Sequence, residues 1–121
     1  MNNDKMKLSN VKLCCELLKI SGLLYSVLFY FENNKEWDKQ LFAVSLNVMG
    51  LYQIEKESKY LLEIYLTIHG ILYIKEIITR EELKSILFKM AGDLKRKTKK
   101  IVKIYNISGF QLGIYSDSIK G

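Results

Sequence analysis

The sequence predicts an all-α protein, a single helical domain over residues 1–121 folded as an antiparallel four-helix bundle. The chain has no proline and only 7 glycines, so little interrupts its helices. Apolar residues recur at three- and four-residue steps in four stretches, which is the period of a helix that buries one face. The polar breaks between these stretches are short, and short connections favour antiparallel neighbours.

The first helix is expected to begin at Ser9 or Asn10, after a flexible N-terminus over residues 1–8. It is expected to end at Asn33-Asn34, because asparagine tolerates the left-handed conformation at a helix end. Its predicted buried stripe is wide enough for a central helix and comprises Leu13, Cys14, Leu17, Leu18, Ile20, Leu24, Tyr25, Val27, Leu28, Phe29 and Phe31.

The second helix is expected over residues 35–55, although residues 42–48 (FAVSLNV) also alternate as a strand would. Its predicted inner face comprises Trp37, Leu41, Val44, Val48, Leu51 and Tyr52. The third helix is expected from Ser58, a candidate cap, to about Ile78. Its predicted inner face comprises Leu62, Tyr65, Ile68 or His69, and Leu72.

The fourth helix is expected over Thr79–Tyr105 and carries the clearest local signal. Thr79 and Glu82 have the spacing of a capping box, in which each side chain pairs with the other residue's backbone amide. The predicted inner stripe comprises Leu83, Ile86, Leu87, Met90, Leu94, Ile101 and Ile104, with Lys97 falling on it. Residues 106–121 are expected to form a short fifth helix or a tail that docks Phe110 and Tyr115.

The same fourth stretch holds the whole charge imbalance of the chain. Residues 79–105 contain nine Lys or Arg and three Asp or Glu, which equals the net +6 of the protein, and the remainder sums to zero. Such density is typical of contacts with the phosphate backbone of RNA or single-stranded DNA. A solvated helix end and a site for an acidic protein or lipid remain alternatives. The candidate nucleic-acid-binding residues are Lys89, Lys95, Arg96, Lys97, Lys99, Lys100 and Lys103.

No pattern in the sequence indicates an enzyme, a cofactor or a metal. His69 lacks partners at ligand spacing and is expected at the core edge or the surface. The adjacent Cys14 and Cys15 cannot form a disulfide framework, which indicates a reducing, cytoplasmic location; one is expected to be buried and the other at the core edge. The apolar run over residues 20–31 is shorter than the ~20 residues that a membrane-spanning helix needs, so no membrane insertion is expected.

Three segments resemble parts of the small α-helical subunits of CRISPR ribonucleoprotein effector complexes. They are ISGLLYSVLFYF (20–31), KYLLEIYLTIHGILYIKE (59–76) and SGFQLGIYS (108–116). The resemblance implies a role in antiviral defence as a non-catalytic subunit that stacks with copies of itself and with other subunits. It also implies backbone contacts to a guide RNA–target duplex or to the displaced strand.

A second class of protein has a similar layout. Bacteriocin immunity proteins are small, basic, cytosolic helical bundles, and residues 80–115 resemble their long last helix followed by an aromatic tail containing glycine. This resemblance implies an immunity or inhibitor protein that acts by protein–protein binding.

Overall fold

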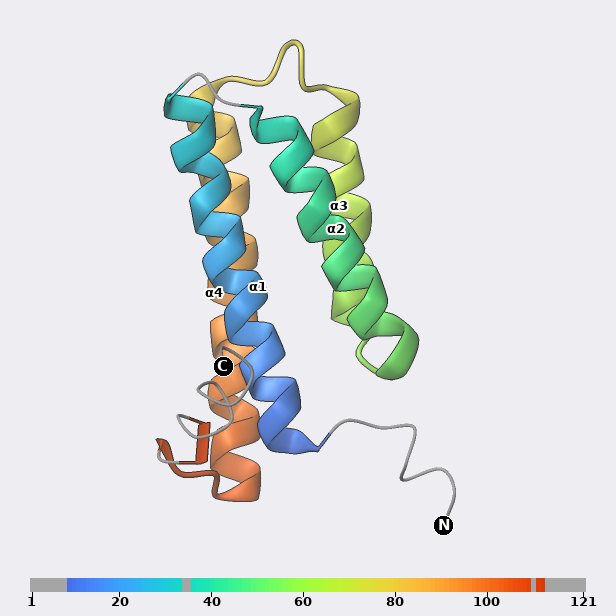
Figure 1. Cartoon of the computed structure of the whole chain (residues 1–121), viewed down its shortest axis with the longest axis vertical. Helices are drawn as coiled ribbons and strands as arrows, with labels where there is room; N and C mark the ends of the chain where they lie inside the picture. Colours follow the sequence, from blue (N-terminus) through green and yellow to red (C-terminus); the bar gives the residue numbers. More distant parts are fainter. Residues whose placement is uncertain (1–8, 34–35, 110, 113–121) are drawn as a thin grey trace.

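A computed structural model describes residues 9–33, 36–109 and 111–112 of the chain. It contains α1 (Asn10–Glu32), α2 (Trp37–Ile54), α3 (Lys59–Tyr73) and α4 (Arg80–Tyr105), which alternate in direction (Figure 1). The predicted all-α class and the helical bundle are confirmed. The strand alternative for residues 42–48 is wrong, because that segment lies inside α2. The predictions for residues 1–8, Phe110 and Tyr115 concern positions outside the described residues.

The helices associate as two antiparallel pairs. α1 packs most extensively against α4 and α2 against α3, and a smaller contact between α1 and α2 joins the pairs. Figure 1 shows the pairs close together at the end where α1 finishes and α2 begins, and further apart at the end where α2 turns into α3. The second half of α4 lies at the end where the pairs diverge.

Local signals set the starts of α1 and α4 as predicted, whereas α2 begins at Trp37 and Ser58 precedes α3 without a side-chain capping bond. The Ser9 hydroxyl accepts a hydrogen bond from the Lys12 amide at 3.2 Å. The Thr79 hydroxyl accepts from the Glu82 amide at 3.2 Å, and the Glu82 carboxylate accepts from the Thr79 amide at 2.9 Å, so the capping box is complete. Each bond satisfies an amide that the first turn of a helix would leave unpaired.

The first helix ends at Asn33 as predicted, but not by the predicted conformation, and the predicted end of α3 is wrong. Asn33 has φ −101° and is not left-handed; instead its side-chain amide donates to the Phe29 carbonyl at 2.8 Å. The left-handed cap is Asn106, with φ 50°, at the end of α4. α3 ends at Tyr73 rather than Ile78, because the amides of residues 77 and 78 both donate to the Ile74 carbonyl in a turn. That turn directs the Ile78 side chain back into the core.

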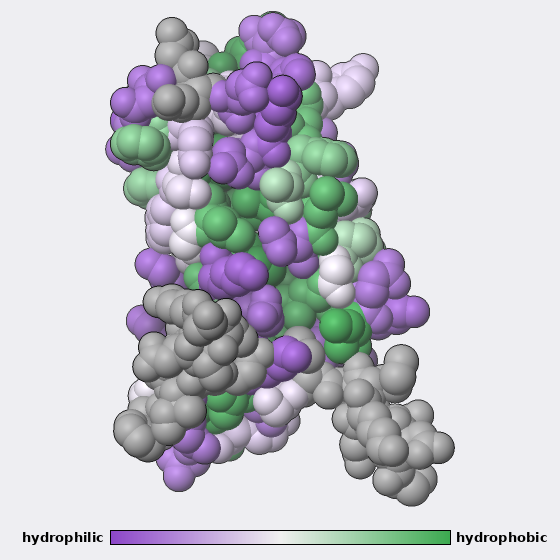
Figure 2. Space-filling view, in the orientation of Figure 1, coloured by the Kyte–Doolittle hydropathy of each residue, from purple (hydrophilic) through white to green (hydrophobic). Residues whose placement is uncertain are grey.

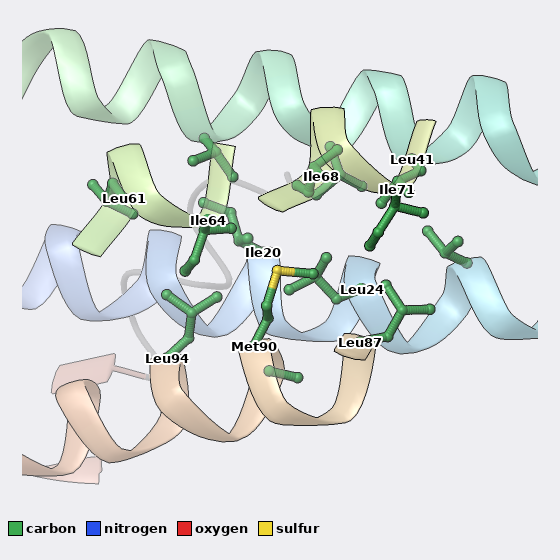
Figure 3. Close-up of a cluster of buried hydrophobic side chains, with 14 of the residues drawn as sticks. Ile20, Leu24, Leu41, Leu61, Ile64, Ile68, Ile71, Leu87, Met90 and Leu94 are labelled. Carbon is green, nitrogen blue, oxygen red and sulfur yellow. The ribbon is translucent and has the colours of Figure 1, made fainter. Parts of the chain in front are cut away.

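One apolar core lies between the two pairs. Figure 3 shows Ile20 and Leu24 of α1 facing side chains from the other three helices, including Leu41, Ile68 and Met90. Each large apolar side chain buried in this way contributes about 1.5–3 kcal/mol relative to exposure, which offsets much of the conformational entropy lost on folding.

The predicted face of α3 is wrong by about one residue. Its buried side chains are Leu61, Ile64, Ile68 and Ile71, whereas the predicted Leu62, Tyr65 and Leu72 are half-buried. α3 is apolar over most of its circumference, so periodicity leaves its orientation open.

In α1 the buried stripe is narrower than predicted, because Leu18 and Phe29 are exposed, and both cysteines are buried rather than one. In α4 the stripe continues through Thr98 rather than Lys97, and Ile104 is exposed.

The helix α1 is, by length and composition, also apolar enough to cross a membrane. Its most apolar 18-residue window has a mean hydropathy of 1.5, and 50% of that window is buried inside the bundle. A central core helix of a soluble protein meets the same criterion.

Candidate nucleic-acid interface

The second half of α4 presents the basic residues, and α1 supports it along one side. Leu94 and Thr98 of α4 are buried, and the Cys14 sulfur lies 4.0 Å from the Thr98 carbonyl oxygen. The second half of α4 therefore packs against α1, and at the end of the helix Ile104 and Tyr105 are exposed.

All seven candidate residues are exposed, but they do not form one cluster. Residues four apart on a helix lie above one another on one face. Lys95, Lys99 and Lys103 therefore form a row, which we call the lysine row. Arg96, Lys97 and Lys100 point to the other side of α4, toward the start of α3. The structure thus divides six of the seven candidate residues between two surfaces, and Lys89 lines neither of them.

The lysine row borders a shallow groove of about 360 Å³ with an apolar floor. Leu18 of α1, Val102 of α4 and Leu112 of the C-terminal segment form much of that floor. Leu112 reaches it because Ser108 begins another helical turn: its hydroxyl accepts from the Gln111 amide at 3.0 Å, while its own amide donates to the Gln111 side chain at 2.8 Å. Residues 109, 111 and 112 are helical, while most of residues 106–121 lie outside the described residues, so the expectation of a short helix or a docked tail stays a prediction.

A larger cleft, of about 710 Å³, opens on the other side of α4 where the helix pairs diverge. It has mixed charge, and its lining residues are Glu57, Lys59, Tyr60, Glu63, Asp93, Arg96, Lys97 and Lys100. The charge pattern of α4 alone did not predict the contribution of Lys59 and Tyr60. They come from a different helix, and only the packing of α3 beside α4 brings them to this cleft.

Aromatic rings and one carboxylate hold part of the basic set in place. The Lys97 amine lies 5.1 Å from the centre of the Tyr60 ring, and the Lys95 amine lies 4.6 Å from that of Tyr25. Cation–π contacts of this kind fix a flexible amine over a ring face. Burial raises the pKa of the Tyr60 hydroxyl, so Tyr60 is neutral at physiological pH.

Asp93 pairs with two of the candidate bases. It lies 3.7 Å from the Lys89 amine and also accepts a hydrogen bond from Arg96. Exposed pairs such as these exchange partners easily. Among the described residues, no ion pair engages Lys99, Lys100 or Lys103, so these three are the most available for an anionic ligand.

The described residues contain no cluster of three or more side chains able to hold a metal ion. His69 lies in the α2–α3 seam, between the rings of Tyr65 at 4.4 Å and Phe42 at 5.9 Å, and its buried Nε2 has no hydrogen-bond partner among the described residues. Burial raises the pKa of both cysteine thiols, which keeps them protonated and poorly nucleophilic.

Comparison with protein-family models, with curated proteins and with solved structures finds no match to this chain.

Proposed function

We propose that this chain is a non-catalytic, cytoplasmic subunit of a larger ribonucleoprotein assembly that contacts the phosphate backbone of RNA or single-stranded DNA. The observation that carries the proposal is the lysine row, on a helix that holds the entire net charge of the protein. These amines are exposed, and none of the three in the row has an ion-pair partner among the described residues. The row of amines fits contacts to the phosphate backbone rather than a base-specific site, because lysine amines spaced one helical turn apart recognise charge and not base edges.

The apolar floor beside the lysine row also supports a single strand. A duplex presents a continuous phosphate surface, whereas a single strand exposes base faces that stack or pack on apolar groups. Leu18, Val102 and Leu112 provide such a surface next to the amines of Lys99 and Lys103.

The proposal is tested by fluorescence anisotropy with labelled single-stranded RNA and DNA. A site with about five phosphate contacts on a single strand loses about 100-fold in affinity between 50 and 200 mM salt. The double variant Lys99→Glu/Lys103→Glu is expected to weaken binding at least about 10-fold. The matched control Lys39→Glu/Lys84→Glu changes the net charge equally at the opposite end of the bundle and should retain most of the affinity. Absence of binding at about 50 mM salt, or equal loss in both variants, would remove the proposal.

A second candidate function, an immunity or inhibitor protein, is favoured by the mixed charge of the cleft. Glu57, Glu63 and Asp93 line it together with the bases, and carboxylates repel phosphate but suit a protein surface of alternating charge. An inhibitor of this kind would show no affinity for nucleic acid and would protect cells against its cognate toxin.

A further inference from the structure

The outer surface of the α2–α3 pair is apolar and has no charged residue in its centre. Residues 41–54 of α2 contain no Asp, Glu, Lys or Arg, and neither do residues 64–73 of α3. The charged side chains of this pair lie toward its two ends. At one end Asp38 contacts Lys75 at 3.0 Å and Lys39 follows in the first turn of α2. At the other end are Glu55, Lys56 and Glu57 of the turn, with Lys59 and Glu63 in the first two turns of α3. Helices on the surface of a monomer usually carry charges on their solvent face.

Four side chains on this surface are both large and exposed. Phe42 and Leu46 of α2 are 46% and 57% exposed, and Leu66 and Tyr73 of α3 are 60% and 90% exposed. The Phe42–His69 ring contact sets the register of the two helices. Leu46 lies one turn after Phe42 in α2, and Leu66 lies about one turn before His69 in the antiparallel α3, so Leu46 and Leu66 are neighbours. One turn after His69, Tyr73 lies at the edge of the same surface. We call this surface, Phe42, Leu46, Leu66 and Tyr73, the apolar face; Figure 2 shows hydrophobic side chains along the α2 side of the molecule.

The exposed area of the apolar face reaches the upper end of the range found on single-chain proteins. At about 150–250 Å² per large side chain, the exposed fractions amount to roughly 400–600 Å². The largest patch on a typical monomer is about 300–600 Å². Half-buried Met49, Leu62 and Tyr65 lie in the same seam and extend the surface toward the roughly 800 Å² that each partner contributes to a standard interface.

Charge indicates which occupant the apolar face accepts. Residues 36–76, which include α2 and α3, contain six acids and four bases, a net charge of −2. Nucleic acid and anionic membranes therefore find no electrostatic attraction there. A second copy of this chain would bury no charged side chain at the centre of this face, whereas contact through α4 would place two segments of net charge +6 against each other.

We propose that the chain forms a two-fold symmetric homodimer in which the apolar faces of two copies pack against each other. A two-fold interface requires a self-complementary surface. Two antiparallel helices with apolar side chains on both satisfy that requirement, because each α2 can lie against the partner's α3. The two α4 helices then point outward on opposite sides of the dimer. The inference does not depend on nucleic-acid binding.

The test is the mass of the nuclease-treated full chain in solution, measured by sedimentation velocity up to about 100 µM, where a dimer of micromolar dissociation constant is nearly complete. We expect a dimer whose fraction rises with protein concentration and that persists in about 1 M salt. Salt screens the attraction between charged groups but does not weaken the burial of apolar surface. Leu66→Glu should weaken the dimer at least about 100-fold, since it buries two carboxylates in the interface. Leu46→Asn is a milder variant with the same expected direction, and circular dichroism checks that each variant is folded.

The matched control is Ile104→Glu, which changes an exposed apolar residue of α4 outside the apolar face and should leave the dimer intact. A wild-type monomer at the highest concentration would overturn the proposal, as would equal effects of Ile104→Glu and Leu66→Glu. Flotation of a monomeric chain with phosphatidylcholine vesicles would assign the face to a lipid surface instead. Lys99→Glu/Lys103→Glu separates this inference from the proposed function, because that variant should lose nucleic acid and still dimerise.

Discussion

The α1–α4 pair and the α2–α3 pair are both antiparallel helix pairs, yet they differ in how their helices are joined and in what they expose. Ser21 of α1 donates a hydrogen bond to the Ala91 carbonyl of α4 across a close, small-residue contact. Ser45 of α2 is equally buried, but its hydroxyl donates to Phe42 within its own helix. The outer surface of α4 is basic, whereas that of α2 and α3 is apolar. Two helix pairs around one core can therefore present surfaces for two different kinds of partner.

The largest effect is expected from the core that the two pairs share. Leu94→Ala in α4 and Leu61→Ala in α3 each remove a fully buried side chain, and each should destabilise the protein by about 2–5 kcal/mol. Because the core is continuous across the pairs, both variants should lower the midpoint of a single unfolding transition. Chemical denaturation followed by circular dichroism measures this. Two separate transitions, with each variant affecting only its own pair, would show that the pairs fold independently.

An intermediate effect should distinguish the two buried serines. Ser21→Ala leaves the Ala91 carbonyl without the hydrogen bond from α1, and we expect a loss of about 1 kcal/mol. Ser45→Ala removes a bond within one helix, where the Phe42 carbonyl keeps its own helical amide partner, and alanine has the better helix propensity. Its expected change in unfolding free energy is therefore near zero or favourable. Equal losses in both variants would contradict the difference between the helix pairs.

The smallest effect is expected at the ion pair that joins the ends of α2 and α3. The hydrogen bond from Lys75 lowers the pKa of the Asp38 carboxyl below its ordinary value of about 3.9. The stability linked to Asp38 is therefore fully present above that ordinary value and is lost as the pH falls through the lowered pKa of the folded state. Asp38→Asn should lower the melting temperature at neutral pH by at most about 3 °C.

Acid titration of that variant supplies the direct check. Wild type should lose this contribution below about pH 4, whereas Asp38→Asn should show a weaker loss over the same range. Glu32 of α1 pairs with Arg80 of α4 at the same end of the bundle, so Glu32→Gln is the matching variant for the other pair. An identical acid profile for wild type and Asp38→Asn would show that the Asp38–Lys75 pair contributes nothing to stability.

The sequence by itself determined the features that depend on near neighbours in the chain. Thr79 and Glu82 form a capping box wherever the helix packs, because both partners lie within one turn. The four helices and the charge of residues 79–105 also follow from the sequence, since helical period and composition are local properties. All seven candidate bases are exposed as expected, because a lysine or arginine amine is costly to bury.

Only the tertiary structure decided which face each helix buries and which neighbours its side chains meet. α3 is apolar on nearly every side, so its orientation depends on how the other helices fill the core, and that selected Ile64 over Tyr65 for burial. Thr98 rather than Lys97 faces α1, because a short side chain fits the close α1–α4 contact and a lysine does not. The same packing placed Tyr60 beside Lys97 and left Leu66 exposed. These outcomes depend on contacts between residues far apart in the chain, which no local pattern encodes.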